Sequence, residues 1–203
     1  MKSLDVFNLE GKVAVITGAS KGIGKAIAYA LGDCGAKVVV SSRKQESLDE
    51  VVAEFKASGI EALAVVANVG NMEDVDNLIS KTLEHFGGID IVVNNAATNP
   101  IFGALVDADT NAFDQIMNVN VKGIFELAKK AHPSMKKRGG GSVINISSIG
   151  GISPEPWLGL YSVSKAALIS LTQVMAKEWG KDGIRANVIC PGLITTKFSK
   201  ALW

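Results

Sequence analysis

Short apolar runs alternate with longer segments of helical periodicity along this chain, and that alternation restricts the fold more than any other feature. The short runs are rich in valine and isoleucine and are apolar on both alternating faces. Such runs are typical of strands buried between two helix layers in a parallel sheet. We predict strands within residues 12–17, 36–42, 61–67, 89–95, 141–147 and 184–190.

The segments between these runs have the apolar spacing of amphipathic helices, and most of them end in glycine. The predicted helices cover residues 22–35, 46–59, 72–88, 110–131 and 161–183. A strand–helix unit repeated about six times predicts an α/β, doubly wound Rossmann fold with a central parallel sheet and helices on both faces. Ligands of such folds bind at the carboxyl ends of the strands. No linker is visible, so we expect residues 1–203 to form a single domain.

Composition narrows the classes of function. Hydrophobic residues make up 47% and charged residues 20% of the chain, which excludes intrinsic disorder, and a net charge of +1 offers no field for nucleic acid or an anionic membrane. Cys34 and Cys190 match neither a disulfide framework nor a metal site. The N-terminus lacks the apolar stretch of a signal peptide. We therefore expect a cytoplasmic protein that binds a small molecule or acts as an interaction module, with no metal, nucleic-acid or membrane partner.

A glycine-rich turn follows the first predicted strand. In "TGASKGIGKAIA", Gly18, Gly22 and Gly24 lie where the chain passes from strand to helix. Glycine lets the backbone approach a bound group closely, and the helix beyond presents free N–H groups and a positive dipole end to a pyrophosphate. The spacing GxxxGxG departs from the general GxGxxG fingerprint, and a purely structural turn is the alternative. Its position in a βαβ unit favours a dinucleotide site.

The end of the second predicted strand indicates which dinucleotide binds. An acidic residue about 20 positions past the glycines holds the ribose hydroxyls of NAD, whereas an arginine accommodates the 2′-phosphate of NADP. Here Ser42 and Arg43 lie at the strand end, and the first acid, Glu46, falls within the next predicted helix. Lys21 adds a second positive charge from the glycine turn. The predicted cofactor is NADP(H); a solvated loop arginine is the alternative for Arg43.

Tyr161 and Lys165 lie four residues apart at the start of the last predicted helix, so their side chains share a helical face. Ser148 ends the preceding strand region, and Asn120 lies within the helix before it. An ammonium beside a phenol lowers the phenol's pKa from its usual value near 10. We expect Tyr161 to give a proton to a carbonyl oxygen, or to take one from an alcohol, during hydride transfer.

Together these motifs resemble the single-domain short-chain dehydrogenase/reductase family over almost the whole chain. "TGASKGIG" is similar to the family's cofactor turn, "NNAA" to its motif after strand four, and "CPGLITT" to its segment after strand six. "YSVSK" with Ser148 and Asn120 is similar to its catalytic tetrad. The resemblance implies that the catalytic residues are Asn120, Ser148, Tyr161 and Lys165.

The resemblance also implies a role for each catalytic residue. Ser148 would hydrogen-bond the reacting oxygen and stabilise its developing charge. Lys165 would hold the nicotinamide ribose, and Asn120 would interrupt its helix and hold a water that links Lys165 to solvent. The alternatives are an exposed helical asparagine and a serine that only caps a turn.

By the same resemblance, the cofactor site runs along the carboxyl edge of the sheet. Its residues are Gly18, Ser20, Lys21, Gly22, Ile23, Gly24, Ser42, Arg43, Asn68, Val69, Asn95, Ala96, Ala97, Tyr161, Lys165, Pro191, Gly192 and Thr196. Asn68 stands where the family has an aspartate beside the adenine, and its amide can still accept a hydrogen bond. Ala97 stands where the family has a glycine. Either departure is expected to weaken cofactor binding.

Within the family, "VVVSSRKQ", "NPIFG", "KRGGGSV" and "PGLITTKFSKALW" are most similar to NADP-dependent carbonyl reductases of the retinal-reductase type. Pro154, Pro156, Trp157 and Leu158, just before Tyr161, predict an apolar wall for the substrate. A loop that packs on its own core is the alternative. The expected reaction is reduction of a lipophilic ketone or aldehyde, with a sugar ketone (gluconate-type) reductase or a 3-oxoacyl thioester reductase as alternatives.

Family members typically continue past the point where this chain stops. The resemblance therefore implies that the chain lacks the family's C-terminal lid helix and last strand. A module that binds nucleotide without catalysis is the alternative of a different class. Family habit further implies a homotetramer or homodimer, built partly from the helices that contain Asn120 and Tyr161.

Overall fold

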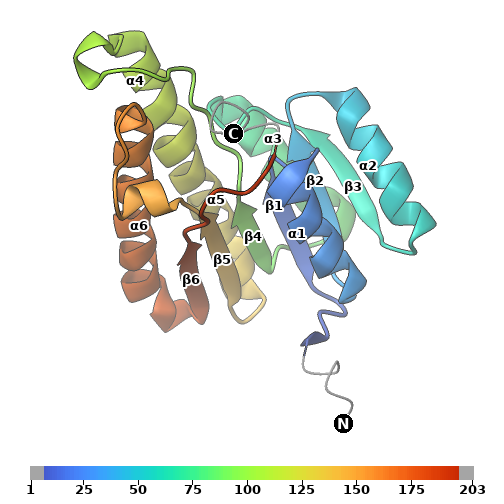
Figure 1. Cartoon of the computed structure of the whole chain (residues 1–203). Coiled ribbons are helices and arrows are strands. Elements are labelled where there is room, and N and C mark those ends of the chain that lie inside the picture. The colour runs from blue at the N-terminus through green and yellow to red at the C-terminus, as the bar shows by residue number, and fades with distance from the viewer. Residues whose placement is uncertain (1–6, 197–203) are drawn as a thin grey trace.

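A six-stranded parallel sheet forms the centre of the molecule (Figure 1), whose computed structural model describes residues 7–196. The strands are β1 (Val13–Thr17), β2 (Lys37–Ser42), β3 (Ala62–Val66), β4 (Ile91–Asn94), β5 (Gly141–Ile146) and β6 (Ile184–Ile189). Their order is β3-β2-β1-β4-β5-β6, and every neighbouring pair is parallel. The chain thus winds outward from β1 to β3 and then outward again on the other side from β4. Ligands of such sheets bind at this point of reversal, outside the carboxyl ends of the strands.

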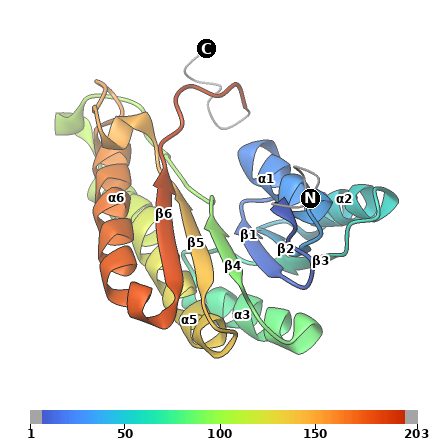
Figure 2. The same cartoon turned by 90° about the horizontal axis from the view of Figure 1, so that it is seen from below.

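Helices cover both faces of the sheet, as the sequence predicts. They are α1 (Gly22–Asp33), α2 (Gln45–Ala57), α3 (Met72–Phe86), α4 (Thr110–Met117), α5 (Gly123–Lys137) and α6 (Gly159–Trp179). One apolar core lies under α1 and α2 and includes Ala28, Leu48 and Phe55; the other lies under α3, α5 and α6 and includes Leu78 and Met175. Figure 2 shows the two layers on opposite sides of the strands. The doubly wound architecture is confirmed.

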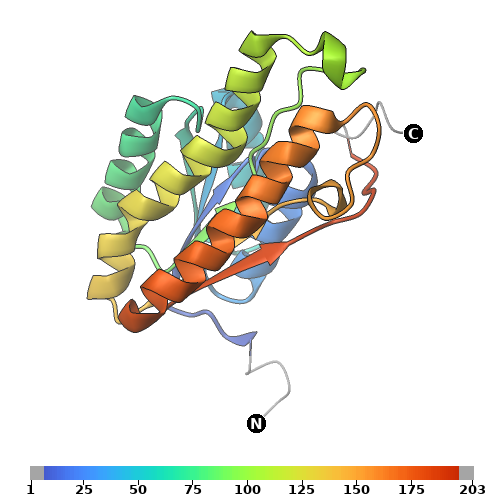
Figure 3. The same cartoon turned by 90° about the vertical axis from the view of Figure 1, so that its left-hand side faces the viewer.

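Residues 110–131 do not form the single α-helix that their periodicity predicts. The π-helical turn Asn118–Lys122 separates α4 from α5, and α5 continues to Lys137. Despite the π turn, α4 and α5 continue in the same direction and together lie beside α6 (Figure 3). A π turn takes an extra residue into the helical ring and is frequently found at functional sites. Here it contains Asn120, so the expected interruption of that helix is present.

Two features that bear on partners can be stated for the described part of the chain. No helix within residues 7–196 is long and apolar enough to cross a bilayer. In the same range, no three or more His, Cys, Asp and Glu side chains cluster in a way that could hold a metal ion.

Candidate active site

Ser148, Tyr161 and Lys165 meet where β5 ends and α6 begins. Ser148 caps the short 3₁₀ turn Ile149–Gly151 by accepting a hydrogen bond from the Gly150 N–H at 3.1 Å. The side chains of Ser148 and Tyr161 are hydrogen-bonded to each other. Lys165 is only 2% exposed, and its Nζ lies 5.5 Å from the centroid of the Tyr161 ring. The structure thus brings together three of the four predicted catalytic side chains at the carboxyl edge of the sheet.

Burial controls the proton affinities of this group. It raises the pKa of Tyr161, an effect that the hydrogen bond with Ser148 opposes in part. It also lowers the pKa of Lys165 to about 8. The expected net lowering of the Tyr161 pKa is wrong in this structure, because burial of the phenol dominates and raises it. The Lys165 Nζ donates to the Ile146 carbonyl at 2.8 Å. A raised pKa keeps the Tyr161 phenol protonated at neutral pH.

Asn120 is completely buried and is not the exposed helical asparagine of the alternative interpretation. Its Oδ1 accepts a hydrogen bond from the Thr98 N–H at 2.8 Å, and its Nδ2 donates to the Thr98 carbonyl at 2.9 Å and to Ser164 Oγ at 3.0 Å. Ser164 in turn donates to the Tyr161 carbonyl at 2.7 Å. The amide therefore ties the segment after β4 to the first turns of α6. The predicted water beside Lys165 stays a prediction.

The glycine turn has the shape and polarity of an anion site. Lys21 is the N-cap residue of α1 without a side-chain cap, and the first turn of the helix carries no acid. The first N–H groups of a helix have no intrahelical partner, so these are available to an anion. A Cβ on Gly24 would lie 2.4 Å from both the Gly18 carbonyl oxygen and Asn95 Nδ2. Only glycine fits there, and the turn is suited to a pyrophosphate.

The loops after β4 and β6 border the glycine turn. Asn95 Nδ2 donates to the carbonyls of Thr17 and Gly18 at 3.0 and 3.1 Å, and the Ala96 N–H donates to Thr17 Oγ1 at 3.1 Å. From the other side, Thr196 Cγ2 lies 3.4 Å from the place of a Cβ on Gly22. These contacts place the predicted cofactor residues Asn95, Ala96 and Thr196 beside the glycine turn.

The loop after β6 also reaches the turn that carries Ser148. The Pro191 carbonyl accepts a hydrogen bond from the Ile149 N–H at 3.0 Å. Gly192 beside it is exposed. This loop therefore connects the glycine turn to the catalytic group.

The predicted adenosine side lies at the ends of β2 and β3. Ser42 ends β2, Arg43 beyond it is exposed, and Glu46 lies in the first turn of α2 as expected. Asn68 Oδ1 accepts from the Gly70 N–H at 3.1 Å, so one of its two acceptor positions is already used. Val69 beside it is buried. Three further predicted residues, Ser20, Ile23 and Ala97, are half-buried along the same edge.

Sequence reasoning missed the polar groups that support the site. Thr17 and Thr98 hold Asn95 and Asn120 through the contacts above. Below them, the buried Asn145 accepts from Asn94 Nδ2 at 2.8 Å and donates to Thr172 Oγ1 at 2.8 Å, which links β4, β5 and α6. Asn145 inside an otherwise apolar strand was the signal in the sequence that could have predicted this network, because buried polar groups need hydrogen-bond partners.

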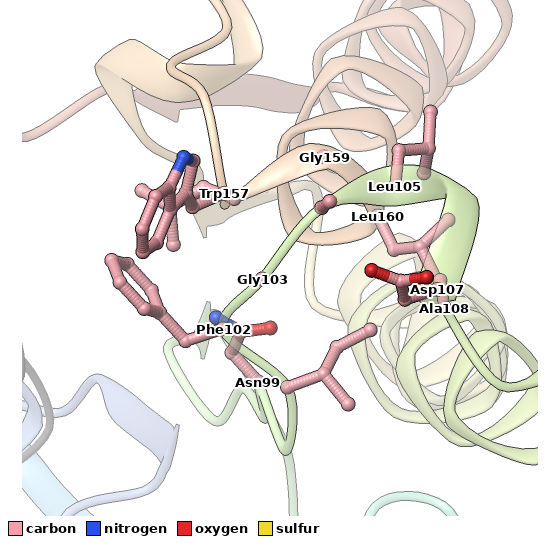
Figure 4. Close-up of a pocket in the computed structure, with 12 residues that line it drawn as sticks. Asn99, Phe102, Gly103, Leu105, Asp107, Ala108, Trp157, Gly159 and Leu160 are labelled. Atoms are coloured by element: carbon pink, nitrogen blue, oxygen red, sulfur yellow. The ribbon is translucent and has the colours of Figure 1, made fainter.

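The predicted apolar wall is half correct. A cavity of about 380 Å³ lies between residues 99–108 and residues 157–160 (Figure 4). Trp157 and Leu158 line it, whereas Pro154 and Pro156 are exposed and are not among its lining residues. Phe102, which the sequence did not single out, supplies the facing wall. Because both prolines are exposed, neither the substrate wall nor a loop packed on its own core describes them.

Comparison with known proteins gives one family. The family model described as short chain dehydrogenase matches residues 12–203. Among curated relatives, dehydrogenase/reductase SDR family member 4 of Sus scrofa is 48% identical over 96% of this chain and 70% of its own length. Tropinone reductase-like 3 of Erythroxylum coca is 45% identical over 95% of this chain and 74% of its own length.

Two solved structures have nearly the same fold. A gluconate 5-dehydrogenase from Burkholderia cenocepacia, in complex with NADP and tartrate, superposes with a TM-score of 0.93 at 33% identity, covering 98% of this chain and 78% of its own. An L-sorbose reductase from Gluconobacter frateurii, complexed with NADPH and L-sorbose, superposes with a TM-score of 0.91 at 38% identity. The match covers 94% of this chain and 73% of the reductase chain.

Proposed function

We propose that this chain, which belongs to the short-chain dehydrogenase/reductase family, is an NADP(H)-dependent oxidoreductase that reduces lipophilic ketones or aldehydes, or oxidises the corresponding alcohols. The observation that carries the proposal is the hydrogen-bonded Ser148 and Tyr161 pair beside the buried Lys165. In this proposal Asn120 completes the catalytic group. The residues along the carboxyl edge, from the glycine turn to Thr196, bind the cofactor.

The nicotinamide, when bound, supplies the hydride that goes to the carbonyl carbon. Tyr161 donates its phenolic proton to the carbonyl oxygen, and its raised pKa keeps that proton available at neutral pH. Ser148 donates a hydrogen bond to the same oxygen as negative charge develops on it. The Lys165 ammonium stabilises the phenolate that Tyr161 becomes, and water then returns the proton to the phenolate. In the oxidative direction each step runs in reverse.

Activity in the reducing direction is expected to fall as the pH rises through about 8, because the pKa of Lys165 is lowered to that value and the ammonium is lost there. Without burial the lysine would keep its charge to a pH near 10. The measurement is kcat/KM for NADPH-dependent reduction as a function of pH, since this ratio reports groups of the free enzyme. A profile that stays flat to pH 10 contradicts the assignment of Lys165.

The choice of NADP(H) over NAD(H) rests on Arg43 and Lys21, two exposed cations near the predicted adenosine side, and on the absence of an acid at the end of β2. Arg43→Ala is expected to reduce the preference for NADPH over NADH about tenfold, since a charge-assisted contact to the 2′-phosphate is lost. The ratio of the two kcat/KM values measures this. Lys44→Ala, next in the chain and equally exposed, is the control; an equal effect of both variants would point to general charge rather than a phosphate contact.

The substrate proposal rests on the largely apolar lining of the cavity beside α6. The test is NADPH oxidation with a panel of aromatic ketones, aliphatic aldehydes, sugar ketones and a 3-oxoacyl thioester, with NADH as the cofactor control. Preferred turnover of the aromatic and aliphatic carbonyls supports the proposal. The two solved relatives make sugar ketones the second candidate, and turnover of those alone would replace it.

NADPH binding without any turnover would favour a nucleotide-binding module. A cytoplasmic location and a homodimer or homotetramer stay predictions; light scattering of the purified chain tests the second.

A further inference from the structure

The cavity beside α6 adjoins the catalytic group. Its volume of about 380 Å³ falls within the range of small-molecule sites. Leu160, one of its lining residues, directly precedes Tyr161, and Asn99 directly follows Thr98, whose backbone holds Asn120. Ser148, Tyr161 and Lys165 are not among its lining residues, so we take the cavity as the place for the far end of a substrate whose carbonyl group reaches Tyr161.

An aromatic pair closes one side of the cavity. The ring centroids of Phe102 and Trp157 are 5.7 Å apart, and the Gly103 N–H donates to the Trp157 carbonyl at 3.1 Å, so the two cavity loops are held together. Among residues 7–196, Trp157 is the single non-glycine residue with a positive φ, at 73°. A bulky residue in the left-handed region is strained, and such strain collects at binding sites. The tryptophan is also 61% exposed, so burial does not account for its place.

Two hydrogen-bond acceptors on residues that line the cavity have no partner among the described residues. Asp107 is the only ionisable side chain that lines the cavity, and it forms no salt bridge within residues 7–196. Asn99 Oδ1 is buried and accepts no hydrogen bond from the described residues. Figure 4 shows the Asp107 carboxylate turned toward the centre of the cavity. Asp107 is exposed, so water solvates its carboxylate when the cavity is empty, whereas Asn99 Oδ1 is shielded from the cavity. The uncompensated charge of Asp107 therefore favours a cationic ligand in this space.

We propose that the cavity binds the non-reacting end of the substrate and that this end is an apolar ring carrying a protonated amine. The proposal rests on the proposed function and names a narrower substrate class for it. The ring packs against Phe102 and Trp157, where a cation is also attracted to the aromatic faces. The ammonium pairs with the Asp107 carboxylate. Basic aromatic ketones are therefore preferred over neutral ketones of the same shape.

A pair of ketones with the same heavy-atom skeleton tests this preference. In 4′-(dimethylaminomethyl)acetophenone a protonated nitrogen replaces the central carbon of the isobutyl group of 4′-isobutylacetophenone. The wild-type chain is expected to reduce the aminoketone with a kcat/KM about tenfold higher than that for the isobutyl ketone, because an ion pair and a cation–aromatic contact act together. Calorimetric titration of each ketone gives a second readout that needs no turnover. Equal values for the two ketones in both measurements would overturn the proposal.

Variants assign the preference to the cavity. Asp107→Asn is expected to remove most of the preference by lowering kcat/KM for the aminoketone far more than kcat/KM for the isobutyl ketone. Asp109 lies outside the cavity lining, so Asp109→Asn should leave the preference at the wild-type value. Trp157→Gly is expected to raise KM for both ketones about tenfold without lowering Tm, because glycine adopts the positive φ freely. A preference that survives Asp107→Asn overturns the proposal.

The same assays distinguish a failure of the amine inference from a failure of the proposed function. If the chain reduces other carbonyl compounds with NADPH but treats the two ketones alike, only the amine inference fails. If no carbonyl compound is reduced, the proposed function fails, and calorimetry alone then decides whether the cavity prefers the amine.

Discussion

Tyr161→Phe is expected to lower kcat for carbonyl reduction about a thousandfold, within the usual range for loss of a positioned general acid. The phenylalanine keeps the ring and removes only the hydroxyl that gives the proton and bonds to Ser148. Because the ring is kept and many other residues of the predicted site bind the cofactor, affinity for NADPH should change much less than kcat. The decrease in NADPH absorbance gives kcat, and cofactor fluorescence gives Kd.

Tyr29→Phe is a matched control, since Tyr29 is the only other tyrosine in the chain and lies on α1. It should retain full activity. A Tyr161→Phe variant with at least a tenth of the wild-type kcat would mean that another group, or water, supplies the proton.

Lys165→Met is expected to lower kcat/KM between a hundredfold and a thousandfold, roughly the loss that follows removal of one preorganised charge at a reacting site. The phenolate that forms on Tyr161 would lose its neighbouring cation, and the cofactor ribose would lose a donor. Tm should change little, because removing a buried charge and losing the hydrogen bond to the Ile146 carbonyl act in opposite directions, and methionine has a similar length. Activity, cofactor Kd and thermal unfolding are measured together.

Lys177→Met provides the control on the same helix, since this lysine is exposed near the end of α6. It should behave as the wild type does. A Lys165→Met chain that unfolds at a much lower temperature would show that the lysine is needed for folding, and its lost activity would then say nothing about chemistry.

Local patterns sufficed to predict the sheet, and the resemblance of short motifs to a known family predicted which side chains meet at its edge. The valine-rich runs are buried strands because both of their faces are apolar, and parallel pairing brings their carboxyl ends to one edge. Residues four positions apart lie on one face of an α-helix, so the spacing of Tyr161 and Lys165 predicts that their side chains are neighbours. In the structure both side chains lie together at that edge. These features depend on short stretches of chain.

Features that depend on distant main-chain groups could not be predicted. The raised pKa of Tyr161 follows from the burial of its phenol, which depends on how distant segments pack around it. The partners of Asn120 are the N–H and carbonyl of Thr98, and backbone groups carry no sequence signature. The cavity likewise needs two segments about fifty positions apart to meet, held by Gly103 and Trp157.

The most direct test of the central claim is transfer of deuterium from NADPH labelled at the hydride position of its nicotinamide to an aromatic ketone, followed by mass spectrometry of the alcohol. The account predicts an alcohol with one deuterium on the carbinol carbon from the wild-type chain and almost none from Tyr161→Phe. Unlabelled ketone recovered unchanged, despite measured binding of NADPH, would contradict the claim that this site transfers a hydride.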